Sequence, residues 1–404
     1  MTFQLHPAAF PEIPAPETGR RCYQLTHGPA FHYPLYYYLP SVTGDGRFLV
    51  HHRYDGTETQ LVRLDLRTGE SKVLTQARGS DGTWVPWCGP SGRGVRDHRS
   101  VLDPEQGSLL YFDGNDARCV DVPGGEDRPL FTLPEDRLPI GQNCLSPDGR
   151  EFIYIHHDAA SFREIYSARP WKRWLSRGTC MAAYDRETGQ QREILRINSP
   201  IHHVNPYGDR NLVFCHPATE NGLLWTDSAG GWYSHLRTQD AAERTICHYL
   251  ATRRGLMYEL SDASAVPRAA GRYDPVNHRS WEFPLPSEFG YTHTGMDPEG
   301  LFWFFETCYP PPWQEAGPAG RRHTFQFVHA WQPDDTPVWQ TLCGNWPTYG
   351  HGQKSHFHPR LSPDGRWLLF TAGDADTRTN QIFAMEVADV VPAASLPCPQ
   401  AAVS

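Results

Sequence analysis

The sequence predicts an all-β protein built as a seven-bladed β-propeller, and three observations predict it. The 404 residues include 13 Trp, 18 Tyr and 19 Phe, whose large rings favour sheet faces. The 35 Gly and 36 Pro are spread along the chain, as turns between many short elements require. Helical periodicity is weak, whereas one pattern of a turn followed by an apolar strand recurs seven times.

The repeated pattern is a turn with Asp or Pro and Gly that leads into an apolar strand, as in SPDGRWLLFTAG from Ser362. The copies lie about 42 to 65 residues apart, which brackets the propeller blade period of roughly 40–50 residues. The copies from Ala251 and Asp297 are weaker. A pair of β-sandwiches, or a propeller of six or eight blades, is the alternative. The turn glycines are Gly46, Gly107, Gly149, Gly208, Gly255, Gly300 and Gly365.

Several copies are followed by a second signature, a strand, a tight Thr-Gly turn and another strand. It reads LVRLDLRTGESKVLT from Leu61 and MAAYDRETGQQREIL from Met181, and both are predicted hairpins. A blade of antiparallel strands cannot bury both of its faces alone, so blades must stack around an axis. We therefore expect residues 1–390 to form a single propeller domain and residues 391–404 a C-terminal tail. Longer gaps between copies, such as residues 308–350, are expected to be loops.

The composition disfavours several classes of function. With 37 basic and 46 acidic residues the net charge is −9 and no basic stripe occurs, which disfavours a nucleic-acid partner. No apolar run approaches the roughly 18–20 residues that cross a bilayer, and the N-terminal stretch lacks the pattern of a signal peptide. The ten cysteines are scattered without a CxxC pair, as in reduced proteins. We expect a cytoplasmic protein with no membrane partner.

Potential metal ligands gather in GQKSHFHPRLSPDGRWLLFTAG, directly before a predicted strand. His356 and His358 share the period of two that puts side chains on one face of a strand, while Gln353 must reach in from the preceding loop. Imidazole nitrogens and an amide oxygen suit a divalent ion such as Mn²⁺, Zn²⁺ or Ni²⁺. Taken alone, such a pair of histidines is more often a packing or surface feature.

The propeller prediction strengthens the metal interpretation, because loops from different blades meet at the central axis. His293 lies directly before the copy at Asp297, and His248 directly before the copy at Ala251. These positions match those of His356 and His358 in the last blade. Three consecutive blades therefore deliver histidines at equivalent heights, which favours one shared site.

At these residues the chain resembles the oligogalacturonate lyases, seven-bladed polysaccharide lyases that cleave short pectin fragments. The Gln353 segment is similar to that family's Gln-x-x-His-x-His-Pro segment with its following turn and strand. The resemblance implies that Gln353, His356, His358 and His293 are metal ligands, and that His248 in TICHYL is the active-site histidine. FCHPATENGLLW from Phe214 also resembles a family stretch, and the similarity spans the chain, although only the Gln/His segment is specific.

The chain departs from the family pattern in the catalytic pocket. The family arginine implicated as the base falls on Leu223, which cannot abstract a proton. The glutamates that follow two family histidines fall on Tyr249 and Pro217. The resemblance therefore implies a retained metal cage with one rebuilt wall. This favours a different uronate-containing substrate, or a propeller that binds without turnover.

The leading hypothesis is a metal-dependent lyase that acts by β-elimination on an acidic oligosaccharide. Mn²⁺ is the first choice of cofactor, with Zn²⁺, Ni²⁺ or Ca²⁺ as alternatives. A non-catalytic carbohydrate- or protein-binding propeller with a structural metal is the second hypothesis. A metal-dependent hydrolase is weaker, because no pair of carboxylates appears beside the cluster.

The candidate side chains for this chemistry lie outside the ligand set. His248 is the first candidate base, because imidazole titrates near neutrality. Its alternative role is that of a buried histidine in the packing. The other catalytic candidates are Tyr249 and His216. Aromatic and basic residues that can stack on sugars and pair with carboxylates are Trp171, Arg173 and Arg244. The pairs His51–His52, His156–His157 and His202–His203 are expected to be structural, because alternation along a strand separates the members of each pair.

Overall fold

The structure is a computed structural model in which strands dominate. Among the residues that it describes, the 3-10 helices are η1 (Pro7–Ala9) and η2 (Gly352–Ser355). None of the helices in the described part is long and apolar enough to cross a membrane. The structure describes residues 2–78, 93–95, 99–161, 178–198, 201, 203–215, 223–237, 245–252, 255–261, 267–274, 277–285, 293–297, 300, 302–309, 320–329, 339–350 and 352–390.

Hydrogen bonds join the described strands into seven sheets of four or five strands, numbered here in chain order. Sheet 1 contains β3 (Phe31–Pro34), β4 (Phe48–Tyr54), β5 (Glu58–Asp65), β6 (Ser71–Val73) and β7 (Arg93–Gly94). Sheet 2 contains β8 (Val101–Asp103), β9 (Ser108–Asp113), β10 (Asp116–Asp121) and β11 (Asp127–Thr132). Sheet 3 contains β12 (Arg137–Pro139), β13 (Cys144–Leu145), β14 (Glu151–Asp158), β15 (Thr179–Asp185) and β16 (Gln191–Ile197).

The remaining sheets follow in the same manner. Sheet 4 contains β17 (Val204–Tyr207), β18 (Asn211–Cys215), β19 (Leu223–Asp227) and β20 (Ser234–Arg237). Sheet 5 contains β21 (Thr245–Thr252), β22 (Gly255–Ser261), β23 (Pro267–Asp274) and β24 (Arg279–Pro284). Sheet 6 contains β25 (Thr294–Met296), β26 (Phe302–Tyr309), β27 (Arg321–His329) and β28 (Trp339–Thr348). Sheet 7 contains β29 (Arg360–Leu361), β30 (Trp367–Asp374), β31 (Thr379–Glu386), β2 (Arg21–Gln24) and β1 (Glu12–Pro14).

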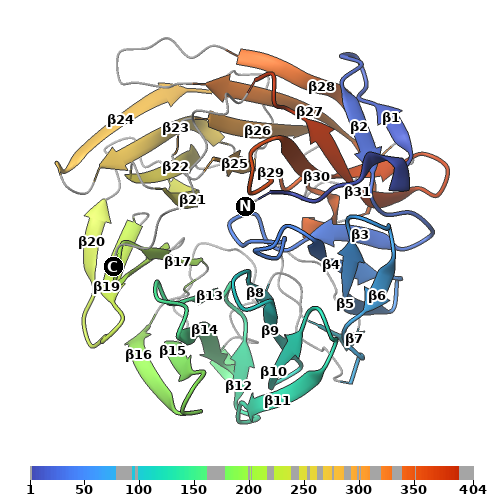
Figure 1. Ribbon diagram of the computed structural model, residues 1–404. Helices are drawn as coiled ribbons and strands as arrows, with labels where there is room; N and C mark the ends of the chain where they lie inside the picture. The colour runs from blue at the N-terminus through green and yellow to red at the C-terminus, as the bar shows by residue number, and fades with distance from the viewer. Residues whose placement is uncertain are drawn as a thin grey trace.

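The sheets stand around a common axis, with strands such as β8, β17 and β21 towards the middle of the ring and strands such as β11, β16 and β24 at the rim (Figure 1). The predicted all-β propeller is therefore confirmed. The ring closes within sheet 7, where β2 from the start of the chain pairs with β31 from its end and aligns Cys22 with Met385. A buried hydrogen bond from the Thr26 hydroxyl to the Gln381 side chain, 2.9 Å long, supports this closure.

Each sheet contains one of the turns that the sequence pattern identified, placed immediately before its second strand. The seven glycines all have positive φ, from 61° at Gly107 and Gly208 to 127° at Gly255, a region that costs glycine nothing. In three copies a hydroxyl donates to the Asp two residues on and accepts the N–H of the residue five positions on. These hydroxyls belong to Thr43, Ser146 and Ser362.

The two predicted Thr-Gly hairpins are present as β5–β6 and β15–β16. The prediction that residues 308–350 form a loop is wrong, because β27 and β28 lie within this range and complete sheet 6. Apolar side chains fill the spaces between neighbouring sheets, as where Phe370 and Phe383 of sheet 7 pack on Trp346 of sheet 6. Residues 391–404 lie outside the described part.

Candidate metal centre

The predicted histidines come together where the chain enters the inner strands of sheets 5, 6 and 7. His248 lies on β21, His293 directly before β25, and His356 and His358 between η2 and β29. The ring centre of His293 lies 4.2 Å from that of His356, 4.7 Å from that of His358 and 4.4 Å from that of His248. The shared position within each sheet therefore brings the four rings into one cluster.

The segment that carries two of these rings is not a strand, contrary to the alternation argument. Strand β29 begins only at Arg360, and His358 adopts a left-handed conformation with φ of 48°. This conformation is uncommon for a residue other than glycine and turns the chain locally. The rings of His356 and His358 nevertheless end 5.5 Å apart. Gln353 lies in η2, one short turn before them, and its side chain lies outside the described part.

The spacing of the three rings is close to that of histidines bound to one divalent ion. An imidazole bound through nitrogen at about 2.1 Å has its centre roughly 3.2 Å from the ion, so two adjacent ligand rings are roughly 4.5 to 5.2 Å apart. The separations among His293, His356 and His358 are 4.2, 4.7 and 5.5 Å, so one lies inside this range and the other two lie about 0.3 Å outside it. Neutral imidazoles suit Mn²⁺, Zn²⁺ or Ni²⁺. The donor set therefore matches the predicted metal.

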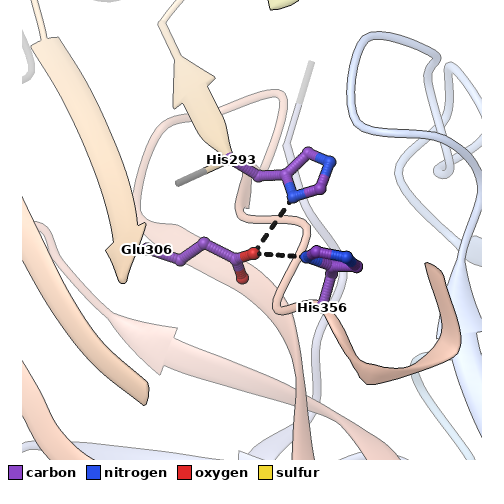
Figure 2. Close-up of side chains that lie close together, drawn as sticks. All are labelled: His293, Glu306 and His356. Atoms are coloured by element: carbon purple, nitrogen blue, oxygen red, sulfur yellow. Dashed lines mark hydrogen bonds and ion pairs between the residues drawn. The ribbon is translucent and has the colours of Figure 1, made fainter. Parts of the chain in front are cut away.

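A carboxylate that the sequence prediction missed lies against this group. Glu306, on β26, places Oε1 3.1 Å from Nδ1 of His293 and 2.9 Å from Nδ1 of His356. The N–H of Phe357 donates to its other oxygen. Ligand atoms of Glu306 and the two histidines lie within 4.8 Å of one another. Figure 2 shows both rings directed at the carboxylate, with the second nitrogen of each ring on the side away from it.

The environment of Glu306 favours a cation nearby. Its side chain is 0% exposed, and its ion-pair partners in the described part are the histidines His293, His323 and His356. Burial raises the pKa of Glu306 well above its ordinary value, the Phe357 N–H opposes this shift, and the charge of Glu259 adds to it. A buried carboxylate is retained in its charged form when a cation or hydrogen-bond donors compensate it. A divalent ion bound by the three rings would provide that charge.

A second buried carboxylate supports His248. Glu259, on β22, is 1% exposed, and its Oε2 lies 3.1 Å from Nδ1 of His248. The hydroxyl of Thr294, the first residue of β25, donates to the other oxygen. Two carboxylates therefore do lie beside the cluster, which corrects the sequence argument against a hydrolase. Both of them lie on the Nδ1 side of the histidine rings, where Glu306 accepts the Phe357 N–H and Glu259 accepts the Thr294 hydroxyl.

Tyrosines from sheet 1 and a further histidine complete the cluster. The segment after β3 brings the ring of Tyr37 5.3 Å from His248 and 5.8 Å from His293. Tyr36 lies 5.6 Å from His358, and its hydroxyl lies 3.0 Å from Nε2 of His203. His203 was expected to be structural, yet its ring lies 6.0 Å from that of His248. His202 lies outside the described part.

The remaining predicted residues are placed as follows. The Tyr249 hydroxyl donates to the Val213 carbonyl over 2.6 Å within an apolar cluster between sheets 4 and 5, away from His248. Leu223 is fully buried in the same cluster. This placement favours packing roles for both residues. The predicted positions His216, Arg244, Arg173 and Trp171 lie outside the described residues.

Comparisons with known proteins agree with this architecture. No family model matches the chain. Oligogalacturonate lyase of Dickeya dadantii is 21% identical over 372 residues, covering 88% of this chain and 90% of that protein. Oligogalacturonide lyase of Pectobacterium atrosepticum is 19% identical over 374 residues, with the same shares covered. A solved oligogalacturonate lyase in complex with manganese matches 94% of this chain and 96% of its own, with a TM-score of 0.72 and 18% identity. The two curated proteins are distant relatives of this chain, and the solved structure supports the propeller fold.

Proposed function

We propose that this divergent relative of the oligogalacturonate lyases is a metal-dependent lyase that cleaves small uronate-containing oligosaccharides by β-elimination. The observation that carries the proposal is the group of three imidazole rings from two neighbouring sheets, backed by the buried carboxylate of Glu306. The names of the relatives supply the substrate class.

The proposed architecture has seven blades, one for each sheet. Each sheet carries one copy of the glycine turn at the same place, before its second strand. This count is the one that the repeat in the sequence predicts. Within it, the proposed site lies at the axis, where blades 5, 6 and 7 meet.

The proposed metal ligands are His293, His356, His358 and Gln353, and the proposed ion is Mn²⁺, as in the solved relative. A divalent cation bound there would supply Lewis-acid charge that makes the proton α to the uronate carboxylate more acidic. Because the ligands are neutral and Glu306 offsets only one unit of charge, an ion bound there would keep net positive charge for an anionic sugar. This explains how a chain of net charge −9 can bind an acidic substrate.

His248 is the proposed base. Its Nδ1 faces Glu259, so a proton on Nδ1 leaves Nε2 as the basic atom. Nε2 takes the α proton, the bond to the 4-linked oxygen breaks, and that oxygen takes up a proton from the imidazolium or from solvent. The Tyr37 ring restricts the position of His248 from one side. The proposal keeps His216 as a further catalytic candidate and Arg244, Arg173 and Trp171 as substrate-binding residues, and all four positions lie outside the described residues.

A non-catalytic propeller with a structural metal is the second candidate. Leu223, at the position of the family arginine, packs in the apolar cluster between sheets 4 and 5 and supplies no charge to the site.

We place the protein in the cytoplasm, in keeping with the five cysteines described as free and buried: Cys22, Cys119, Cys144, Cys180 and Cys343.

The proposed function is tested by incubating the protein with Mn²⁺ and fragments of pectin, alginate, ulvan or glucuronan. Elimination produces an unsaturated sugar, so ultraviolet absorbance should rise with at least one substrate. His356→Ala should abolish both this rise and Mn²⁺ uptake. His157→Ala is the matched control, since that buried histidine pairs with Thr179 in sheet 3, far from the cluster in the chain order. Mn²⁺ uptake without any rise would favour the binding propeller, and unchanged uptake by His356→Ala would contradict the ligand assignment.

A further inference from the structure

The same pair of residues occurs in sheets 5 and 6. His248 on β21 is the direct cross-strand partner of Glu259 on β22. In sheet 6 the Glu306 N–H donates to the His293 carbonyl over 3.0 Å, so these two residues also face each other across the first two strands. In both sheets a carboxylate oxygen of the glutamate lies 3.1 Å from Nδ1 of the facing histidine, within hydrogen-bond distance. The arrangement is therefore repeated from one sheet to the next.

Each glutamate also reaches one sheet further round the ring. Glu259 accepts the hydroxyl of Thr294 in sheet 6. Glu306 accepts the Phe357 N–H, and its Oε1 lies 2.9 Å from Nδ1 of His356, both in the segment that leads into sheet 7. Both side chains are at most 1% exposed, so solvent does not compete for their oxygens. The two carboxylates thus link three consecutive sheets exactly where the histidines gather.

We propose that Glu306 and Glu259 are the positioning residues of this centre: Glu306 fixes the tautomer and orientation of His293 and His356, and Glu259 fixes those of His248. The inference rests on the proposed function for the use made of these rings. It goes beyond that function in assigning a task to two residues outside the ligand and base sets. Carboxylates that accept the distal N–H of ligating histidines have this role in metal sites.

The hydrogen-bond donors around Glu306 decide the direction of each bond. A backbone N–H can only donate, so the Phe357 N–H requires Oε2 to be an acceptor. Oε1 then faces both Nδ1 atoms, and in the ionised carboxylate it accepts a hydrogen bond from each. A histidine protonated on Nδ1 presents the lone pair of Nε2. Since both Nε2 atoms lie on the side away from Glu306 (Figure 2), the lone pairs point away from the carboxylate.

The amide substitution distinguishes the two carboxylates. In Glu306→Gln the amide oxygen must face the Phe357 N–H, so its NH₂ group faces the two Nδ1 atoms and donates to them. Both rings must then carry their proton on Nε2, the atom needed for the metal. In Glu259→Gln the Thr294 hydroxyl can turn and accept from the NH₂ group, and the amide oxygen can still accept from His248. Glu259→Gln is therefore a matched control with an amide at the equivalent place.

The tautomers are measured by nitrogen NMR of metal-free protein labelled on histidine. In the wild type, the signals lost in His293→Gln and in His356→Gln should be those of rings protonated on Nδ1. Glu306→Gln should convert two rings to the Nε2–H form, and Glu259→Gln should convert none. Nε2–H rings in the wild type, or an unchanged spectrum in Glu306→Gln, would overturn the proposal. The wild-type measurement decides the point even if Glu306→Gln does not fold.

Titration with Mn²⁺ alone provides the second readout. Glu306→Gln should weaken Mn²⁺ binding about 10–100-fold, the range for lost outer partners of ligating histidines. Glu259→Gln should leave the dissociation constant within about twofold. Equal affinities for wild type and Glu306→Gln, or equal losses in the two variants, would overturn the positioning role. Absence of Mn²⁺ binding by the wild type would instead refute the proposed function, while the NMR result would still decide the assignment of Glu306.

Discussion

Gly295→Ala tests whether the packing between β25 and the segment before β29 holds the metal centre together. A methyl group at Gly295 would point at the Pro359 carbonyl oxygen, well within the 3.0 Å that Cβ contacts essentially never cross. The obstacle is backbone, so one segment must move by roughly 1 Å, an overpacking that costs about 1–3 kcal/mol of unfolding free energy. Gly295 lies two residues after His293, and Pro359 lies next to His358. The displacement therefore separates two of the three rings.

The assay compares denaturant unfolding and Mn²⁺ titration for wild type, Gly295→Ala and Gly124→Ala. Gly124 is the control because its Cβ would meet only the flexible, exposed carboxylate of Asp121. We expect Gly295→Ala to lose both unfolding free energy and Mn²⁺ affinity, and Gly124→Ala to lose neither. A Gly295→Ala protein that is less stable but binds Mn²⁺ with wild-type affinity would refute the reasoning, because the packing would then not position the ligands.

Two further predictions concern the base and the response to pH. Glu259→Ala should lower kcat by about 100-fold or more with Mn²⁺ affinity unchanged, because the orientation of His248 is lost. Glu259→Gln should retain most of kcat. Equal kcat values for the two variants would contradict this prediction. Burial lowers the pKa of His51 from 6.5 to about 4. As the pH falls, His51 is therefore protonated in the unfolded chain before it is protonated in the folded protein. The free energy of unfolding should decrease by about 3 kcal/mol between pH 6.5 and about pH 4 for this reason. Denaturant unfolding at several pH values should show a smaller loss for His51→Phe than for wild type, and parallel pH profiles would count against the buried neutral histidine.

The architecture could be predicted because its signals are local. Each turn glycine and its Asp or hydroxyl partner lie within a few residues, and together they fix the entry to the second strand of each sheet. Strands β27 and β28 were missed because they lie between two turns of this kind and carry no such turn themselves. Strand β27 is held by its pairing with β26, and a pattern of neighbouring residues in the sequence does not show such a pairing.

The candidate site could be predicted only in part, for the same physical reason. His248, His293, His356 and His358 share one phase of the repeat, so position along the chain was sufficient to group them. Glu306 is bonded to a histidine 50 residues away as well as to one 13 residues away, and it resembles any other residue of an apolar strand until the strands are paired. The alternation of residues in β21 and β22 together with their register would have shown that Glu259 faces His248.

His203 and the tyrosines after β3 reach the cluster from still greater separations. Tyr36 and His203 are 167 residues apart, yet their polar atoms lie 3.0 Å apart. Such contacts follow from the closure of the ring and the order of the sheets. They become visible only when the sheets are placed around the axis.

The central claim is that one divalent cation is bound by Nε2 of His293, Nε2 of His356 and a ring nitrogen of His358. Anomalous diffraction from crystals grown with Mn²⁺ tests it most directly. The account predicts one strong peak about 2.1–2.3 Å from those three atoms, on the side of the rings away from Glu306. A map without a peak at the axis, or with the peak between the Glu306 carboxylate and the two Nδ1 atoms, would contradict it.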